Sequence, residues 1–282
     1  MIKLSANLGF LWLELPLPER ILAAGRAGFD AVECHAPYQW PADEVAAALS
    51  EAEVPLVSLN TRTGGVGDFG LGAIPGRETE MCEYIDEALA YAQATGCPTV
   101  HIVAGVTAHL DRKACEAVLC ANLTHASDAA VALDKSIVIE PMSRRAVPGA
   151  HLGSLDQGID TVTTVGRDNV KILADLFHLQ IQHGDLTERM HAALPMIGHI
   201  QFAAVPDRHE PDHGELDFAW LLPELVTMGY DGCFGAEYRP RTTTDEGLGW
   251  MSRLRNQTSQ PDFAIRPHTL RPKRRAMTEE EQ

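Results

Sequence analysis

The sequence predicts a single (β/α)8 barrel, an α/β fold in which eight parallel strands alternate with helices. Three observations lead to this prediction. The chain has 282 residues, and a barrel of this class usually takes roughly 250. Short apolar runs rich in β-branched residues alternate with segments of helical apolar spacing. Most of these runs are apolar almost throughout, which is typical of parallel strands that are buried on both faces.

Eight apolar runs have the length and composition of strands, and amphipathic segments separate them. The predicted strands are 3–8, 30–34, 55–60, 99–104, 136–140, 171–175, 199–202 and 233–237. The clearest predicted helices are 19–28, 42–52, 80–95, 112–133 and 155–165. This alternation favours a closed barrel over an open sheet. An open doubly wound sheet would also call for a Gly-rich phosphate loop after the first strand, and Ala6-Asn7-Leu8-Gly9-Phe10 offers none.

The character of the chain changes after Trp250, a residue that we expect to pack in the core. The segment 256–282 contains three prolines, the basic cluster Lys273-Arg274-Arg275 and the acidic run Glu279-Glu280-Glu281. Few large apolar residues are available to dock this segment, and mixed charge runs are usually solvated. We therefore expect a barrel domain over 1–255 and a disordered tail over 256–282.

Composition excludes several classes of partner. The formal net charge is -16 and the pI is near 5.1, so the surface repels phosphate backbones and anionic lipids. No apolar run approaches the roughly 20 residues that a membrane span needs, and the start of the chain does not resemble a secretory signal. We expect a cytoplasmic protein with no nucleic-acid or membrane partner; a homo-oligomer is compatible with the sequence. Six cysteines without a Cys-x-x-Cys pair indicate reduced, mostly buried thiols.

Polar residues end the later predicted strands, at the edge where a barrel of this class carries its active site. Four successive strands lead into Glu140, Asp175, Gln201 and Glu237. Three carboxylates so close together would repel one another unless a cation or a proton intervenes. All four side chains offer oxygen, which suits Mg²⁺ or Mn²⁺ more than zinc or copper. The sequence therefore predicts a divalent metal site.

Each of these residues also has a structural interpretation when it is taken alone. A glutamate at a strand end can cap a helix or form a salt bridge, and Gln201 and His178 can be satisfied buried groups. Arg208 can belong to an ordinary polar loop. Arg77 either reaches an anionic substrate or begins the following helix. We assign no ligand role to Glu33, His35 or His101, and the functional interpretation rests on the convergence of the four strand ends.

At these residues the sequence resembles the hydroxypyruvate isomerase family, within the xylose-isomerase-like barrel superfamily. The likeness extends from about Ser5 to Trp250. The motifs that carry it include Ile139-Glu140-Pro141, Asp175-Leu176-Phe177-His178-Leu179-Gln180, Pro206-Asp207-Arg208-His209-Glu210-Pro211 and Glu237-Tyr238-Arg239-Pro240. The chain departs from many relatives at two positions, where Leu173 replaces a Gln and Ala204 replaces an Asp.

The resemblance implies a set of roles. Glu140, Asp175, Gln201 and Glu237 would bind the metal, Glu140 and Glu237 would be the catalytic pair, and His178 and Arg208 would face the substrate. The implied reaction interconverts hydroxypyruvate and tartronate semialdehyde (2-hydroxy-3-oxopropanoate). One glutamate removes a proton beside the carbonyl to give an enediolate, and the other delivers a proton to the neighbouring carbon. The partner is thus a small hydroxy-oxo acid.

Four other functions are compatible with the same fold. A 2-oxo-tetronate isomerase shares the Pro206–Pro211 motif, and a ketose 3-epimerase shares the metal frame but usually has a His in place of Gln201. An apurinic-site endonuclease would need several zinc ions and a basic face, which the charge of -16 opposes. A non-catalytic sugar-acid binding protein would have no use for both Glu140 and Glu237.

Overall fold

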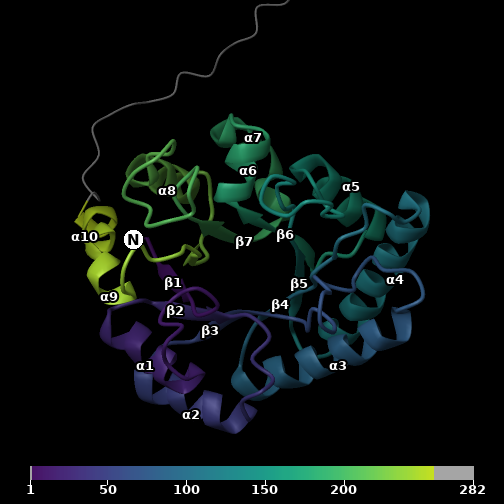
Figure 1. Ribbon diagram of the computed structural model, residues 1–282, viewed down its shortest axis with the longest axis horizontal. Coiled ribbons are helices and arrows are strands. Elements are labelled where there is room, and N and C mark those ends of the chain that lie inside the picture. Colours follow the sequence, from purple (N-terminus) through teal and green to yellow (C-terminus); the bar gives the residue numbers. More distant parts are fainter. Residues whose placement is uncertain (1, 257–282) are drawn as a thin grey trace, which may run out of the picture.

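Eight parallel strands pair in chain order and close into a barrel, with β8 hydrogen-bonded to β1. In this computed structural model, residues 2–256 are described (Figure 1). The strands are β1 (Leu4–Asn7), β2 (Ala31–Cys34), β3 (Leu56–Asn60), β4 (Thr99–His101), β5 (Ser136–Ile139), β6 (Val170–Asp175), β7 (Ile197–Phe202) and β8 (Phe234–Ala236). Each predicted strand overlaps an observed one, so the predicted (β/α)8 fold is confirmed.

The helices form a ring outside the strands (Figure 1). They are α1 (Leu17–Arg26), α2 (Ala42–Ala52), α3 (Glu78–Thr95), α4 (Arg112–Val131), α5 (Leu155–Val165), α6 (Leu176–Gln182), α7 (Leu186–Ala193), the 3-10 turn η1 (Leu194–Met196), α8 (Phe218–Thr227), α9 (Thr244–Gly247) and α10 (Gly249–Asn256). Several begin at a side chain that accepts from their free backbone N–H groups, as Asp111 does for α4 and Ser154 for α5. The five predicted helices match α1 to α5.

An aromatic cluster joins the two ends of the described chain. The Trp250 ring, on α10, packs edge-on against Phe29, Phe202 and Tyr238, and its Nε1 donates to the Tyr238 hydroxyl at 3.2 Å. Trp250 is only 2% exposed, so the prediction that it serves packing is confirmed. This cluster anchors the last helix against the strands of the barrel.

Three further predictions concern regions outside the barrel core. Helix α10 ends at Asn256, one residue beyond the predicted end of the domain, and the predicted tail from 257 onwards lies outside the described residues. All six cysteines are free thiols, with Cys34, Cys97 and Cys115 buried. In the part of the chain that is described, no helix is both long and apolar enough to span a membrane.

Candidate active site at the carboxyl ends of the strands

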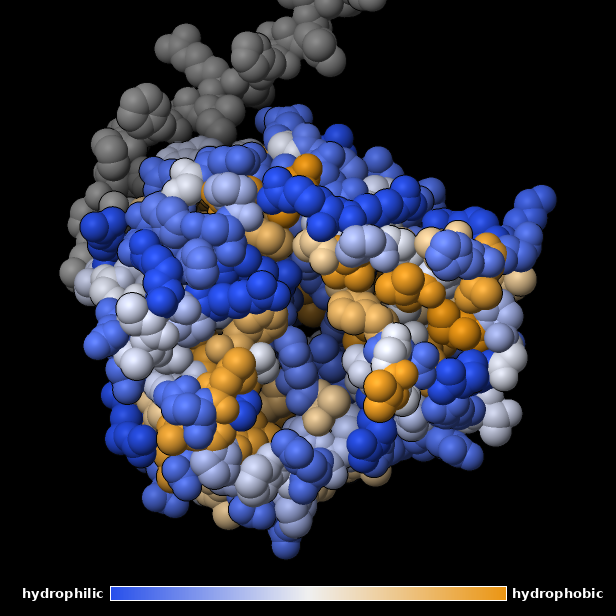
Figure 2. Space-filling view, viewed as in Figure 1, coloured by the Kyte–Doolittle hydropathy of each residue, from blue (hydrophilic) through white to orange (hydrophobic). Residues whose placement is uncertain are grey.

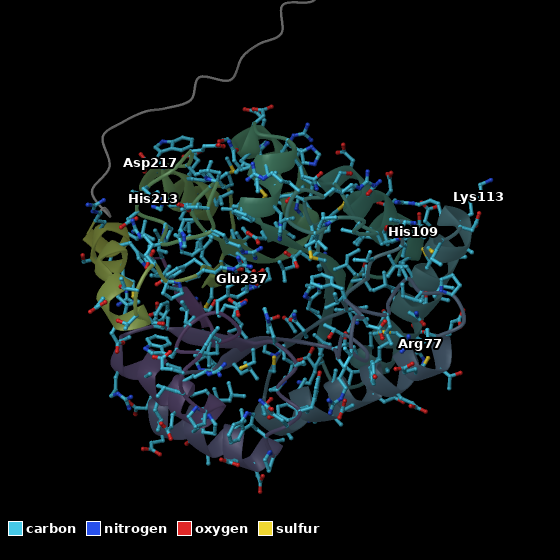
Figure 3. The ribbon with its side chains drawn as sticks, in the orientation of Figure 1. Arg77, His109, Lys113, His213, Asp217 and Glu237 are labelled. Carbon is cyan, nitrogen blue, oxygen red and sulfur yellow. The ribbon has the colours of Figure 1, made fainter. Side chains whose placement is uncertain are left out.

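A cavity of about 910 Å³ opens at the carboxyl ends of the strands. Figure 2 shows a hollow at the centre of this face, and Glu237, which lines the cavity, lies near the centre of Figure 3. Side chains from all parts of the barrel line it, among them Phe10, His35, Thr61, His101, Glu140, His178, Arg208, Glu237 and Arg239. The cavity therefore lies where the sequence predicts the active site.

The two glutamates of the predicted catalytic pair lie in the cavity wall, after β5 and β8, and have opposite electrostatic environments. Burial, together with the charges of Glu237 and Asp175, raises the pKa of Glu140 well above its usual value. Burial alone would also raise the pKa of Glu237, but Arg208 and His35 lower it to about 2. Without a bound cation, this environment favours the protonated form of Glu140, whereas Arg208 and His35 favour the ionised form of Glu237.

Arg208 is the cation at the centre of these carboxylates. Its Nη2 lies 2.9 Å from Asp175 Oδ2 and 3.0 Å from Glu237 Oε2. Burial would lower the pKa of Arg208, but the charges of Glu237, Asp175 and Glu140 raise it above its usual value. The guanidinium also lies over the rings of Phe10 and Phe177, at 5.0 and 4.8 Å from their centroids.

The loop after β7 aims Arg208 into the site through an unusual backbone conformation. The φ angle of Arg208 is 59°, a left-handed value that residues other than glycine rarely adopt. Its backbone N–H donates to Ala204 O at 2.9 Å, and its carbonyl accepts from the Arg239 N–H at 2.7 Å. Strain of this kind persists where surrounding contacts enforce it, and it is concentrated at functional sites.

Asp175 and His178 lie at the corner between β6 and α6. Asp175 Oδ1 caps the helix by accepting from Phe177 N at 2.9 Å. Burial raises the pKa of Asp175 to about 7, although Arg208 opposes the rise. His178 Nε2 accepts from Arg208 Nη1 at 3.0 Å, so its proton is assigned to Nδ1, which faces Ser143 Oγ at 3.2 Å. Burial and Arg208 lower the pKa of His178 to about 3, so the ring is neutral.

A group of donor atoms suitable for a metal ion lies in this wall. One donor atom from each of Glu140, Asp175 and His178 lies within 4.8 Å of the others. The Oε1 atom of Glu140 is buried and has no hydrogen-bond partner among residues 2–256, as expected of a ligand whose partner is a cation. The residues present therefore fit a divalent cation. Glu237 meets this group only through Arg208, which bridges it to Asp175.

Gln201, the fourth residue of the predicted metal set, is buried below the cavity in a network that the sequence did not indicate. Its Nε2 donates to Glu33 Oε2 at 2.6 Å. Glu33 also accepts from Ser5 Oγ at 2.7 Å and contacts His199 Nε2 at 3.1 and 3.2 Å. With its amide nitrogen committed to Glu33, Gln201 has its oxygen left as the group that can bind a ligand.

Three residues in the cavity wall received no functional role from the sequence. His35 Nε2 lies 3.3 Å from Glu237 Oε1, Thr61 directly follows β3, and His101 is the last residue of β4. The predicted strands 55–60 and 99–104 end at Asn60 and Ala104, so the strand-end rule selects neither Thr61, one residue beyond the first of them, nor His101, inside the second. Arg77, in contrast, precedes α3 and pairs with Glu80 and Asp68, far from the centre of the face (Figure 3). It begins a helix and does not line the cavity.

Comparisons with known proteins agree with this geometry. The family model described as "Xylose isomerase-like TIM barrel" matches residues 21–254. The chain is 41% identical over 270 residues to a mouse protein named "Putative hydroxypyruvate isomerase", covering 92% of this chain and 98% of that one. It is 40% identical over 254 residues to the "2-oxo-tetronate isomerase" of Cupriavidus necator, covering 89% and 98%.

Solved structures extend the comparison. A Brucella melitensis protein titled "AP endonuclease, family 2" superposes with a TM-score of 0.87 at 39% identity, covering 89% of this chain and 98% of that one. The 3-keto-D-glucoside 4-epimerase of E. coli superposes with a TM-score of 0.76 at 20% identity, covering 89% and 99%. The second likeness concerns the fold alone.

Proposed function

The chain belongs to the xylose isomerase-like TIM barrel family, and on that premise we propose that this isomerase-type enzyme interconverts hydroxypyruvate and tartronate semialdehyde. One observation carries the proposal: two buried glutamates, Glu140 and Glu237, line one cavity with their pKa values displaced in opposite directions. Isomerisation through an enediolate needs one group that accepts a proton and another that donates one. Relatives of about 40% identity are named for isomerisation of small oxo acids.

In the direction from hydroxypyruvate, the ionised Glu237 removes a proton from C3, and the C3–H electron pair forms the C2–C3 double bond of an enediolate. Glu140, in its protonated form, delivers its proton to C2, and proton exchange with water then returns Glu140 to its acid form and Glu237 to its carboxylate. O3 loses its proton as the aldehyde forms, and O2 gains one as the ketone becomes a hydroxyl. This proton passes between the two substrate oxygens directly or through water, because both ring nitrogens of the neutral His178 in the same wall are committed to Arg208 and Ser143.

Glu237 is a weak base, since its pKa is lowered to about 2. The reaction therefore depends on stabilising the enediolate rather than on the strength of the base. Arg208 supplies a fixed positive charge for this purpose. Its contacts with Asp175, His178 and Glu237 use most of its donors, so we assign it to charge stabilisation first and to contact with the substrate second.

We propose that a divalent cation, Mg²⁺ or Mn²⁺, binds on the Glu140 and Asp175 side of the site. Gln201 and Glu237 would complete the oxygen set, and His178 offers a nitrogen beside it. When bound, such a cation would hold the substrate oxygens and stabilise the negative charge that develops on them. Asp175 caps α6 and pairs with Arg208 whether or not the cation is present.

A 2-oxo-tetronate is the second candidate substrate. The cavity of about 910 Å³ has room for a fourth carbon and its hydroxyl, and the 2-oxo-tetronate isomerase of Cupriavidus necator is as similar as the relatives named for hydroxypyruvate. Both substrates use the same proton transfer, so the choice between them concerns only fit.

The test is turnover in D2O followed by proton NMR, using metal-stripped protein with and without added Mg²⁺ or Mn²⁺. We expect tartronate semialdehyde with deuterium at C2. Turnover of a 2-oxo-tetronate but not of hydroxypyruvate would keep the mechanism and change the substrate. No turnover of either, with every metal, would refute the isomerase proposal.

Variants of the pair test the assigned roles. Glu140→Gln and Glu237→Gln should each lower kcat by about 10²-fold or more, because each removes one partner of the proton transfer. The matched control is Glu51→Gln, on the exposed face of α2, which should retain full activity. Stopped turnover assays measure the three variants side by side, and an active Glu140→Gln or Glu237→Gln enzyme would contradict the assignment.

A further inference from the structure

One wall of the cavity is neutral and has unsatisfied polar groups. Thr61 directly follows β3, and His101 ends the neighbouring strand β4. The Thr61 N–H donates to the His101 carbonyl at 2.9 Å. Their side chains line the cavity, and the residues are 0% and 3% exposed. The adjacent Arg62 contributes no charge here, because its guanidinium is paired with Glu87.

Each of the two side chains has a buried polar atom without a partner among the described residues. Within residues 2–256, neither Thr61 Oγ1 nor His101 Nε2 makes a hydrogen bond, although both atoms are buried. The other two histidines of the cavity are paired: His178 contacts Ser143 and Arg208, and His35 contacts Asn7 and Glu237. Since an unpaired buried polar group costs free energy, folded proteins tolerate it where a ligand supplies the partner.

The chemistry of the two groups limits what they bind. Burial and the charge of His35 lower the pKa of His101 to about 3, so the imidazole is neutral, with one N–H and one lone pair. A threonine hydroxyl also both donates and accepts. Such a pair suits a hydroxyl or carbonyl oxygen. A carboxylate is bound more strongly by a cation than by these two neutral groups. The cations that line the cavity, Arg145, Arg208 and Arg239, come from other segments of the mouth.

We propose that Thr61 and His101 bind the hydroxyl-bearing end of the substrate, so that its carboxylate end is directed to the arginines. This assignment rests on the proposed function and makes it more specific. It orients the hydroxymethyl carbon, from which the proton is taken, within the cavity. Thr61 and His101 are thereby substrate-binding and specificity-determining residues.

The test compares two ligands that differ only in a terminal hydroxyl and are not turned over by isomerisation: glycerate and lactate. Isothermal titration measures their Kd values with the full-length wild type and with Thr61→Val, Thr61→Ser and His101→Phe. We expect the wild type to prefer glycerate by about 10-fold, a typical effect of leaving site hydrogen bonds unmade. Thr61→Val and His101→Phe should abolish most of the preference, while Thr61→Ser, which keeps the hydroxyl, should retain it.

Thermal unfolding separates binding from a structural role. Thr61→Val removes an unpaired polar group and keeps the shape, so its Tm should equal or exceed that of the wild type. An unchanged glycerate preference in Thr61→Val, or a wild type with no preference, would overturn the proposal. If His101→Phe fails to fold, Thr61→Val decides alone. Wild-type turnover of hydroxypyruvate or a 2-oxo-tetronate is measured independently. Failure of the proposed function is therefore distinguished from failure of the proposed roles of Thr61 and His101.

Discussion

At the scale of single residues, the buried acids are held by different partners for different purposes. Glu33 lies beneath the cavity and accepts from Ser5 of β1 and from Gln201 of β7, with His199 against both of its oxygens. Glu140 has an oxygen without any partner in the described part of the chain. A carboxylate surrounded by donors is structural, and one that lacks them is available for a ligand.

The first of these roles predicts the effect of Glu33→Gln. The amide places an NH2 group against neighbours that are themselves donors, so at least one buried hydrogen bond is lost. We expect the free energy of unfolding to fall by about 1–3 kcal/mol, measured by urea denaturation. Glu83→Gln, on the exposed side of α3, should stay within about 0.5 kcal/mol of wild type. Equal stability of the two variants would contradict the network.

The site residues differ in how far a short stretch of sequence is enough to predict their position. Glu140, Asp175, Gln201 and Glu237 each end an apolar run, and that rule needs only the strand and the fold class. The partners of Glu33 could not be predicted, because they depend on which side chains meet across the barrel interior. The bridging position of Arg208 depends on the conformation of a whole loop, which no short pattern in the sequence encodes.

At the scale of elements, β8 shows how a strand accommodates its neighbours. Gly235 pairs with Ser5 of β1 and Gln201 of β7. A Cβ atom at this position would collide with Glu33 Oε1 and lie 2.8 Å from Gln201 Cγ. Glycine is therefore required here by close approach of side chains from β2 and β7.

Gly235→Ala should accordingly destabilise the barrel by about 1–3 kcal/mol, the usual cost of overpacking a core, and displace Glu33 or Gln201. The control is Gly249→Ala in α10, where an added Cβ meets nothing within 4 Å and alanine favours the helix. Urea denaturation should find Gly249→Ala as stable as the wild type or more so. The requirement for glycine in β8 is wrong if Gly235→Ala behaves the same way.

The loop between β7 and α8 contains a second ionic cluster, and its His213 lies away from the centre of the barrel (Figure 3). His213 Nε2 lies 2.8 Å from Asp207 Oδ2, and its Nδ1 lies 2.9 Å from Asp212 Oδ1. Hydrogen bonds to Asp207 and Asp212 raise the pKa of His213 above 6.5, although burial and the nearby Arg241 oppose the rise. The protonated form therefore stabilises the loop that carries Arg208.

This cluster predicts a pH dependence with a definite sign. Because the folded-state pKa of His213 is raised, its contribution is fully present below its unfolded value of about 6.5. It is lost as the pH rises through the higher folded-state value. The stability difference between wild type and His213→Gln should thus be about 0.2–1 kcal/mol at about pH 5.5, where His213 is protonated and both aspartates are ionised, since the pair is partly exposed to solvent, and should shrink towards pH 8.5. Thermal melts at several pH values measure it; a difference that grows with pH would refute the sign.

The elements themselves were the easiest part to predict. Strands buried on both faces and long amphipathic helices give strong periodic signals, and α2 and α5 agree with their predicted bounds. Helices α6, α7 and α9 have eight residues or fewer, too short for two full apolar repeats. Their positions follow from caps and from packing on neighbours, which only the folded structure supplies.

At the scale of the whole molecule, an acidic protein has to bind an anionic substrate. The net charge is -16, so the field at a distance repels an oxo acid. The mouth of the cavity carries two exposed arginines, Arg145 and Arg239, that make no salt bridge within residues 2–256. Fold class and net charge could be predicted from the sequence, but the presence of these two arginines at one cavity could not, because Arg145 and Arg239 are 94 positions apart and reach the same cavity only through barrel closure.

The two arginines should therefore act by long-range attraction, which salt screens. In Arg145→Gln/Arg239→Gln we expect kcat/KM to fall by about 3–10-fold at low ionic strength, and by less than about twofold in 0.5 M salt, where the Debye length is only a few Å. Arg26→Gln, at the end of α1 and on the opposite side of the barrel from the cavity, removes one such charge without affecting the mouth and should leave kcat/KM unchanged. Steady-state assays across a salt series compare the variants with the wild type. A loss that is the same at every salt concentration would mean that the arginines bind the substrate by direct contact alone, and no loss at all would mean that Arg145 and Arg239 are not needed to attract the anion.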